Sequence, residues 1–265
     1  MRMTDRRMHR VLVATLLWLI GCQPVDGPEP DRRAFIEEVL YRGQVHPSCG
    51  DALDQAMASG RIEIALRCPV FIDRVLSQFR LEYLQGISSE EILVGLIDLE
   101  QVKLSAVEET ARYGEDQFQR LLAVYDARED YLMGAAGLRD IQLRFLSNYF
   151  FEQINMGCTN QVSVAFLHLL GRLPTRSELD AGVDLCEGRE AQLLFRRGSG
   201  YFDLLDILTT NGGYLEHQFR YWHEFLFFRQ PETQVVAAWL EMYEAEPHDV
   251  ESIIQFLLIH HAPND

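Results

Sequence analysis

Apolar side chains recur at helical spacing along most of the chain. No proline occurs between Pro69 and Pro174, and the segment between them is rich in the helix-favouring residues Leu, Glu, Arg, Gln and Ala. The spacing predicts helices whose buried faces consist of Ile72, Val75, Leu76, Phe79 and Tyr83, of Phe118, Leu121, Leu122, Tyr125 and Leu132, and of Leu138, Ile141, Phe145 and Tyr149. No stretch alternates apolar and polar residues clearly enough to predict a strand. We therefore expect an all-α fold with about ten helices.

One helix start is marked by its capping residues. Ser88 followed by Glu91 is a capping box, in which each side chain bonds the backbone N–H of the other residue. Ile87 and Ile92 fit the hydrophobic staple around it. A helix is therefore predicted to begin at this point with a defined entry angle.

Residues 165–179 predict two helices joined by a tight corner. Gly171 ends the first helix, Pro174 makes the turn, and Thr175 with Glu178 caps the second helix. Arg172 lies at the end of the first helix, where its charge favours the last carbonyl groups.

A later helix is apolar on two sides. It begins after Asn211, and one of its faces contains Leu215, Phe219, Trp222 and Leu226. Tyr214, His217, Tyr221, Phe225 and Phe228 nearly form a second face. This distribution is typical of a buried helix.

The N-terminal segment 1–21 has the pattern of a secretory signal peptide. Four arginines precede an apolar run from Val11 to Ile20. The sequence Leu19-Ile20-Gly21-Cys22 then resembles the lipobox of bacterial lipoproteins. This resemblance implies that Cys22 carries a lipid such as palmitate after the preceding peptide is removed. An uncleaved N-terminal anchor with an incidental cysteine is the alternative interpretation.

The segment 22–30 is predicted to tether the lipid to the folded chain, because its prolines, glycine and acids disfavour helix formation. In lipoproteins an Asp after the lipidated cysteine usually means inner-membrane retention, and Gln23 stands here instead. The resemblance therefore implies the bacterial outer membrane, with the protein facing the periplasm or the exterior.

The charge of the chain excludes one class of partner. Lys and Arg total 24 against 40 Asp and Glu. Removal of residues 1–21 takes away four Arg and one Asp, which leaves a net charge of about −19. Such a chain repels phosphate backbones, so nucleic-acid binding is not expected.

Four cysteines remain after Cys22, namely Cys49, Cys68, Cys158 and Cys186. None forms C-x-x-C or C-x-x-C-H, which excludes a zinc ribbon and a c-type haem site. Three pairings are possible, and the pairing of neighbours joins Cys49 to Cys68 and Cys158 to Cys186. A helical hairpin at 161–185 would bring the second pair together. Four buried free thiols are the alternative.

Two parts of the chain have a similar outline. Residues 34–40 and 165–170 each open a helix-rich part that contains one cysteine pair. We therefore expect either one domain or two closely packed helical lobes, at 31–157 and 158–265.

The polar residues predict no catalytic residue, metal site or cofactor. His217 and Glu224 share a helix face, but His223 points elsewhere. The adjacent residues His260 and His261 diverge by about 100° around a helix and are expected to be exposed. The segment Gly198-Ser199-Gly200 is interpreted as a flexible loop before a helix, since G-x-S-x-G is missing.

Three motifs follow one another in the C-terminal part, namely residues 170–175 with Glu178, residues 208–210, and Arg220-Tyr221-Trp222. They span about residues 160–230, and Arg172, Pro174, Thr175, Glu178 and Trp222 serve as structural markers. The order of these motifs resembles the planctomycete cytochrome-associated domain of unknown function and similar myxobacterial envelope proteins. The resemblance implies an envelope address and supplies no reaction.

These observations predict a lipid-anchored envelope protein that binds another envelope protein or serves as a scaffold. The alternatives are an accessory or degenerate enzyme domain that works with an exported enzyme, and a binder of a small ligand around Tyr214, Trp222 and Trp239. An exposed apolar patch favours the first function. A deep pocket with convergent polar groups favours the others.

Overall fold

Helices form most of the chain in the computed structural model, which describes residues 32–44, 46–243 and 249–261. The predicted signal peptide, Cys22 and the tether lie outside the described residues. The first half contains α2 (Arg32–Tyr41), α3 (Pro47–Ser59), α4 (Glu63–Leu66), α5 (Pro69–Tyr83), α6 (Ser89–Lys103), α7 (Glu108–Tyr125), α8 (Ala127–Leu132), α9 (Leu138–Phe145) and α10 (Tyr149–Ile154). The second half contains α11 (Cys158–Leu170), α12 (Arg176–Cys186), β1 (Ala191–Leu193), β2 (Arg196–Gly198), α13 (Tyr201–Thr209), α14 (Gly212–Phe227), α15 (Thr233–Tyr243) and α16 (Val250–His261).

The all-α class is confirmed, and twelve helices in the described ranges have seven or more residues, against about ten expected. Fifteen helices occur in the described ranges, and α4, α8 and α10 have six residues or fewer. The pattern from Phe118 to Leu132 belongs to two helices, because α7 ends at Tyr125 and α8 starts at Ala127. Tyr125 is 48% exposed and is not part of the buried face. The apolar spacing in the sequence continues across the turn at Asp126, so it could not show where α7 ends.

The expectation of no strands is wrong for one short hairpin. Strands β1 and β2 pair antiparallel, with Leu193 opposite Arg196. The two-residue loop between them is Leu194-Phe195, and both residues have positive φ, at 47° and 67°. Two-residue hairpins need this backbone, which Asn-Gly usually supplies. The loop has no such residues and therefore carries no turn signature.

Both predicted cysteine pairs are within disulfide distance. Cys49 in α3 pairs with Cys68, just before α5, at a Cα–Cα distance of 5.0 Å. Cys158 and Cys186, at the outer ends of α11 and α12, pair at 5.7 Å. The first disulfide joins two neighbouring N-terminal helices, and the second closes the predicted helical hairpin.

The two halves of the chain form one domain with a shared core. Rings of Phe71 and Phe79 in α5 lie 6.5 Å from the ring of Trp222 in α14, measured between centroids. The buried carboxylate of Glu251 in α16 accepts a hydrogen bond of 2.8 Å from the backbone N–H of Leu138, at the start of α9. The interpretation as one domain therefore describes the structure.

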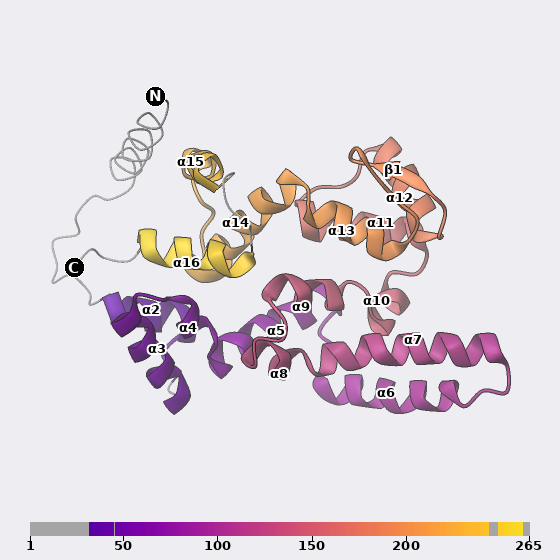
Figure 1. The fold of residues 1–265 in the computed structure, drawn as a ribbon, viewed down its shortest axis with the longest axis horizontal. Coiled ribbons are helices and arrows are strands. Elements are labelled where there is room, and N and C mark those ends of the chain that lie inside the picture. The colour runs from indigo at the N-terminus through magenta and orange to yellow at the C-terminus, as the bar shows by residue number, and fades with distance from the viewer. Residues whose placement is uncertain (1–31, 45, 244–248, 262–265) are drawn as a thin grey trace, which may run out of the picture.

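Helices α6 and α7 form an antiparallel pair that extends from one end of the molecule (Figure 1). The capping box predicted at Ser88 and Glu91 is present and starts α6. Gly114 of α7 allows close approach, because a Cβ there would lie 2.8 Å from Val102 Cγ1 and 2.9 Å from the backbone N of Lys103. The two helices are therefore closely packed where α7 passes the C-terminal end of α6.

Candidate functional site

The outer side of α6 is apolar and exposed. Ile92, Leu96 and Leu99 are buried on its inner side. Leu93, Val94 and Ile97 are 46%, 56% and 55% exposed, and Leu104, the C-cap residue, is 80% exposed. At about 100° per residue, these four side chains share one side of the helix. We call Leu93, Val94, Ile97 and Leu104 the α6 face.

Acidic residues border the α6 face. Glu90 lies at its N-terminal end and Asp98 along one edge, and both are exposed. Neither of these two carboxylates makes an ion pair with any other described residue. On the other edge, Glu100 pairs with Lys103 at 2.9 Å. Residues 88–125, which contain α6 and α7, have eight acids and three bases. The α6–α7 pair is therefore strongly negative.

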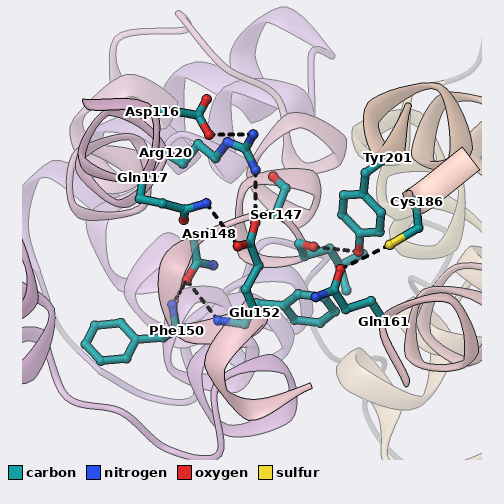
Figure 2. Close-up of polar contacts among 12 residues, drawn as sticks. Asp116, Gln117, Arg120, Ser147, Asn148, Phe150, Glu152, Gln161, Cys186 and Tyr201 are labelled. Carbon is teal, nitrogen blue, oxygen red and sulfur yellow. Dashed lines mark hydrogen bonds and ion pairs between the residues drawn. The ribbon is translucent and has the colours of Figure 1, made fainter. Parts of the chain in front are cut away.

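A polar network in the second half of α7 fixes the α6–α7 pair to the rest of the protein (Figure 2). Glu152 of α10 accepts hydrogen bonds of 3.0 Å from Gln117 Nε2 and from Arg120 Nη1. Arg120 also pairs with Asp116 at 2.7 Å and lies over the ring of Phe202 in α13, 4.7 Å from its centroid. Burial raises the pKa of Glu152. These contacts hold the α6 face in a defined position.

The corner between α11 and α12 contains the predicted structural motif. Thr175 and Glu178 form the predicted capping box, with Pro174 in the turn. Arg172 makes a two-pronged ion pair with Glu178, at 2.8 and 2.6 Å, and also donates to the carbonyl of Leu173. Its expected partners, the last carbonyls of α11, are therefore replaced by a carboxylate. Trp222 is buried in the core.

We expect Glu178→Gln to lower the free energy of unfolding by about 1 kcal/mol at pH 7, because it weakens a helix cap and removes an ion pair. The hydrogen bond from Arg172 is the largest cause that lowers the pKa of Glu178 to about 2. The stabilisation is present above the ordinary pKa of 4.5 and is lost as the pH falls towards 2. Urea unfolding at several pH values should show this dependence in the wild type and in Asp180→Asn, an exposed control on α12. An unchanged acid dependence in Glu178→Gln would contradict the expectation.

A cleft lies beside this corner, and its lining includes Gly171, Asn211, His217 and Arg220. Its positive charges are neutralised, since Arg220 pairs with Glu216 at 2.9 Å and Arg172 pairs with Glu178. Gly171 has a φ of 66°, and a Cβ there would lie 2.4 Å from His217 Nδ1. The cleft therefore depends on close packing of the corner against α14.

The histidines of α14 and α16 differ in their exposure to solvent. His223 is buried, and its Nδ1–H donates to the carbonyl of Arg229 at 2.7 Å. His260 is exposed as expected, but His261 is half-buried against Phe227 and His223. Burial is the main reason that the pKa of His261 falls to about 4. Within the described residues, no three His, Cys, Asp or Glu side chains come together as metal ligands.

The segment at Ser199 is also different from the expected flexible loop. Gly198 belongs to β2, and the backbone N–H of Ser199 donates to Asp203 Oδ2 at 2.6 Å. A carboxylate thus occupies the start of α13. This bond fixes Ser199 just ahead of the N-cap residue Gly200.

A cavity between α5 and α14 has a volume of about 360 Å³. Tyr214, Trp222 and Trp239, where the sequence suggested a small-ligand site, are all buried in the core. The cavity instead opens beside Glu82 and Tyr221. Sequence patterns did not single out Glu82, because its environment comes from a helix 139 residues later.

No family model matches this chain, and neither a curated protein nor a solved structure does so. The resemblances to bacterial lipoproteins and to the planctomycete domain therefore stay predictions. None of the helices within the described ranges is both long and apolar enough to cross a bilayer.

Proposed function

We propose that this protein is a lipid-anchored component of the bacterial envelope that binds another protein through the α6 face. The signal pattern and Cys22 support the anchor, and the exposed aliphatic row on α6 supports partner binding. Contiguous exposed apolar surface is a common feature of interaction sites. The α6 face is the single observation on which partner binding rests.

Charge indicates what kind of surface would cover the α6 face. Two copies of this chain joined through the α6 face would bring two strongly negative surfaces together, and like charges disfavour such contacts. A membrane with anionic lipids would also repel the negative α6–α7 pair. A different protein with an apolar patch and basic residues around it fits better.

A test replaces apolar residues on the surface without disturbing the core. Leu93 and Ile97 are exposed, so Leu93→Ser with Ile97→Ser should leave the fold intact. Membranes of the native host are solubilised in mild detergent, and the size of the complex that contains the protein is measured. We expect the double variant to be found as the monomer, and the wild type in a larger assembly.

The control is Leu81→Ser, which removes an aliphatic side chain that is 63% exposed on α5. This variant should remain in the larger assembly. A double variant that keeps the assembly, or a wild type that is monomeric in every membrane extract, would contradict binding through the α6 face.

An accessory enzyme domain or ligand binder remains the second candidate function. The cavity between α5 and α14 favours it, because polar and aromatic groups converge there. Its chemistry supports a separate inference.

A further inference from the structure

The cavity between α5 and α14 has one acidic end. Gln78 and Glu82 line it from α5, and Tyr221 and Glu224 line it from α14. Glu82 accepts hydrogen bonds from Gln78 Nε2 at 2.6 Å and from the Tyr221 hydroxyl at 3.0 Å. A carboxylate has about four acceptor positions, so these two bonds leave capacity for a further donor.

The charge of Glu82 is not neutralised by any described residue. Both of its partners are uncharged, and neither Glu82 nor Glu224 forms an ion pair within the described ranges. Burial raises the pKa of Glu82, and the nearby negative charge of Glu224 adds to this effect. A partly buried carboxylate without a cation is costly in the folded protein. A bound cation would offset this cost.

Aromatic rings line the same cavity. Tyr221 and Phe225 are nearly parallel, with centroids 6.4 Å apart and an angle of 13° between the rings. Phe228, the C-cap of α14, is 73% exposed and also borders the cavity. The guanidinium of Arg42 lies over the Phe228 ring, 3.7 Å from its centroid, and that of Arg74 lies 4.2 Å from the centroid of Phe225. Aromatic rings attract cations and also pack against alkyl chains, so the ring of Tyr221 and the exposed part of Phe228 are left to contact the alkyl chain of a cation.

The only basic residue among the described residues lining this cavity lies at its other end. Arg74 is eight residues from Glu82 on α5, which corresponds to about 12 Å along a helix. Its guanidinium donates to the carbonyls of Val39, Leu40 and Phe225, at distances of 2.8, 3.1 and 2.7 Å. Arg74 is thus used in joining α2, α5 and α14, and leaves the Glu82 end acidic.

We propose that the Glu82 end of this cavity binds an organic cation, an ammonium or guanidinium group on a short alkyl chain. The carboxylate of Glu82 accepts hydrogen bonds from the cation, and the rings of Tyr221 and Phe228 contact the chain. The cation is either a free amine or the side chain of a Lys or Arg in a bound protein. This site does not depend on the α6 face.

Calorimetry with defined probes tests the site in the oxidised protein. Butylammonium and butylguanidinium should bind with one-to-one stoichiometry and a dissociation constant on the order of 1 mM or lower. Butyramide, which is neutral, and butyrate, which is an anion, should not bind. NMR of protein with labelled tyrosine rings should show a saturable shift of the Tyr221 signal with the two cations.

Three variants separate the site from general charge effects. Glu82→Gln keeps the size and hydrogen bonding of the side chain and should weaken cation binding at least tenfold. Phe228→Ala, at an exposed residue, should weaken it about three- to tenfold. Glu90→Gln removes the same charge on α6 and should have no effect. Thermal unfolding of each variant verifies that it is folded.

The source of the cation is distinguished by a blocked tripeptide, acetyl-Gly-Arg-Gly-amide. Binding as tight as that of butylguanidinium supports a protein side chain, whereas binding of the small cations alone supports a free amine. No saturable binding of either cation, equal binding of butyramide, or full affinity in Glu82→Gln would overturn the proposal.

Discussion

Reduction of both disulfides is expected to unfold most of the protein at 25 °C. The bridges join residues 19 and 28 positions apart. Each is worth about 3–4 kcal/mol in the chain-entropy model, because it restricts the unfolded chain. Together they supply about 7 kcal/mol, which is comparable with the whole stability of an ordinary domain. Urea unfolding with and without reductant, followed by circular dichroism, measures the difference.

Paired serine variants measure how much free energy of unfolding is lost with each disulfide. Cys158→Ser with Cys186→Ser should cost slightly more than Cys49→Ser with Cys68→Ser, because the closed loop is longer. Mass mapping of unreduced peptides verifies the connectivity. A reduced protein as stable as the oxidised one, or a bridge between Cys158 and Cys49 or Cys68, would contradict this expectation.

Cys22→Ser is expected to move the protein almost completely from the membrane to the soluble fraction. The thiol is the proposed site of acylation, and a serine cannot form the thioether. After the proposed removal of residues 1–21 the chain would carry a net charge of about −19, which would give it no attraction to anionic lipids. Cell fractionation followed by mass spectrometry of the N-terminal peptide measures both location and lipid.

The control for this experiment is Gln23→Asn, which changes the neighbouring residue and keeps the cysteine. It should stay in the membrane fraction. A Cys22→Ser protein that remains in membranes, together with a wild-type precursor that is not shortened, would favour the uncleaved anchor.

Local patterns predicted the features whose partners are close in sequence. The capping boxes at Ser88 and Thr175 are present because each needs only a residue three positions later. The bridge between Cys158 and Cys186 follows from a short helical hairpin. The hairpin loop at Leu194 and Phe195 was missed, because neither residue is Asn or Gly, the types that usually supply positive φ in such a loop.

Features that depend on distant partners could not be predicted. His261 is half-buried because α16 packs against α14, which is fixed only by the complete fold. Residues 92–97 of α6 are apolar except for Gly95, a pattern that fits either a fully buried helix or an interface. Only the structure shows that α7 covers one side of α6 and that Leu93 and Ile97 are exposed. Similarly, Tyr221 reaches Glu82 across 139 residues of sequence.

Photo-crosslinking in living cells tests most directly whether a partner protein binds the α6 face. A photoreactive amino acid replaces Ile97 on the α6 face, or Gln119, an exposed control on α7. We expect light to convert the protein with the probe at 97 into one discrete adduct with another envelope protein, and the control to give none. Equal labelling from both positions, or no adduct from position 97, would contradict the proposed function.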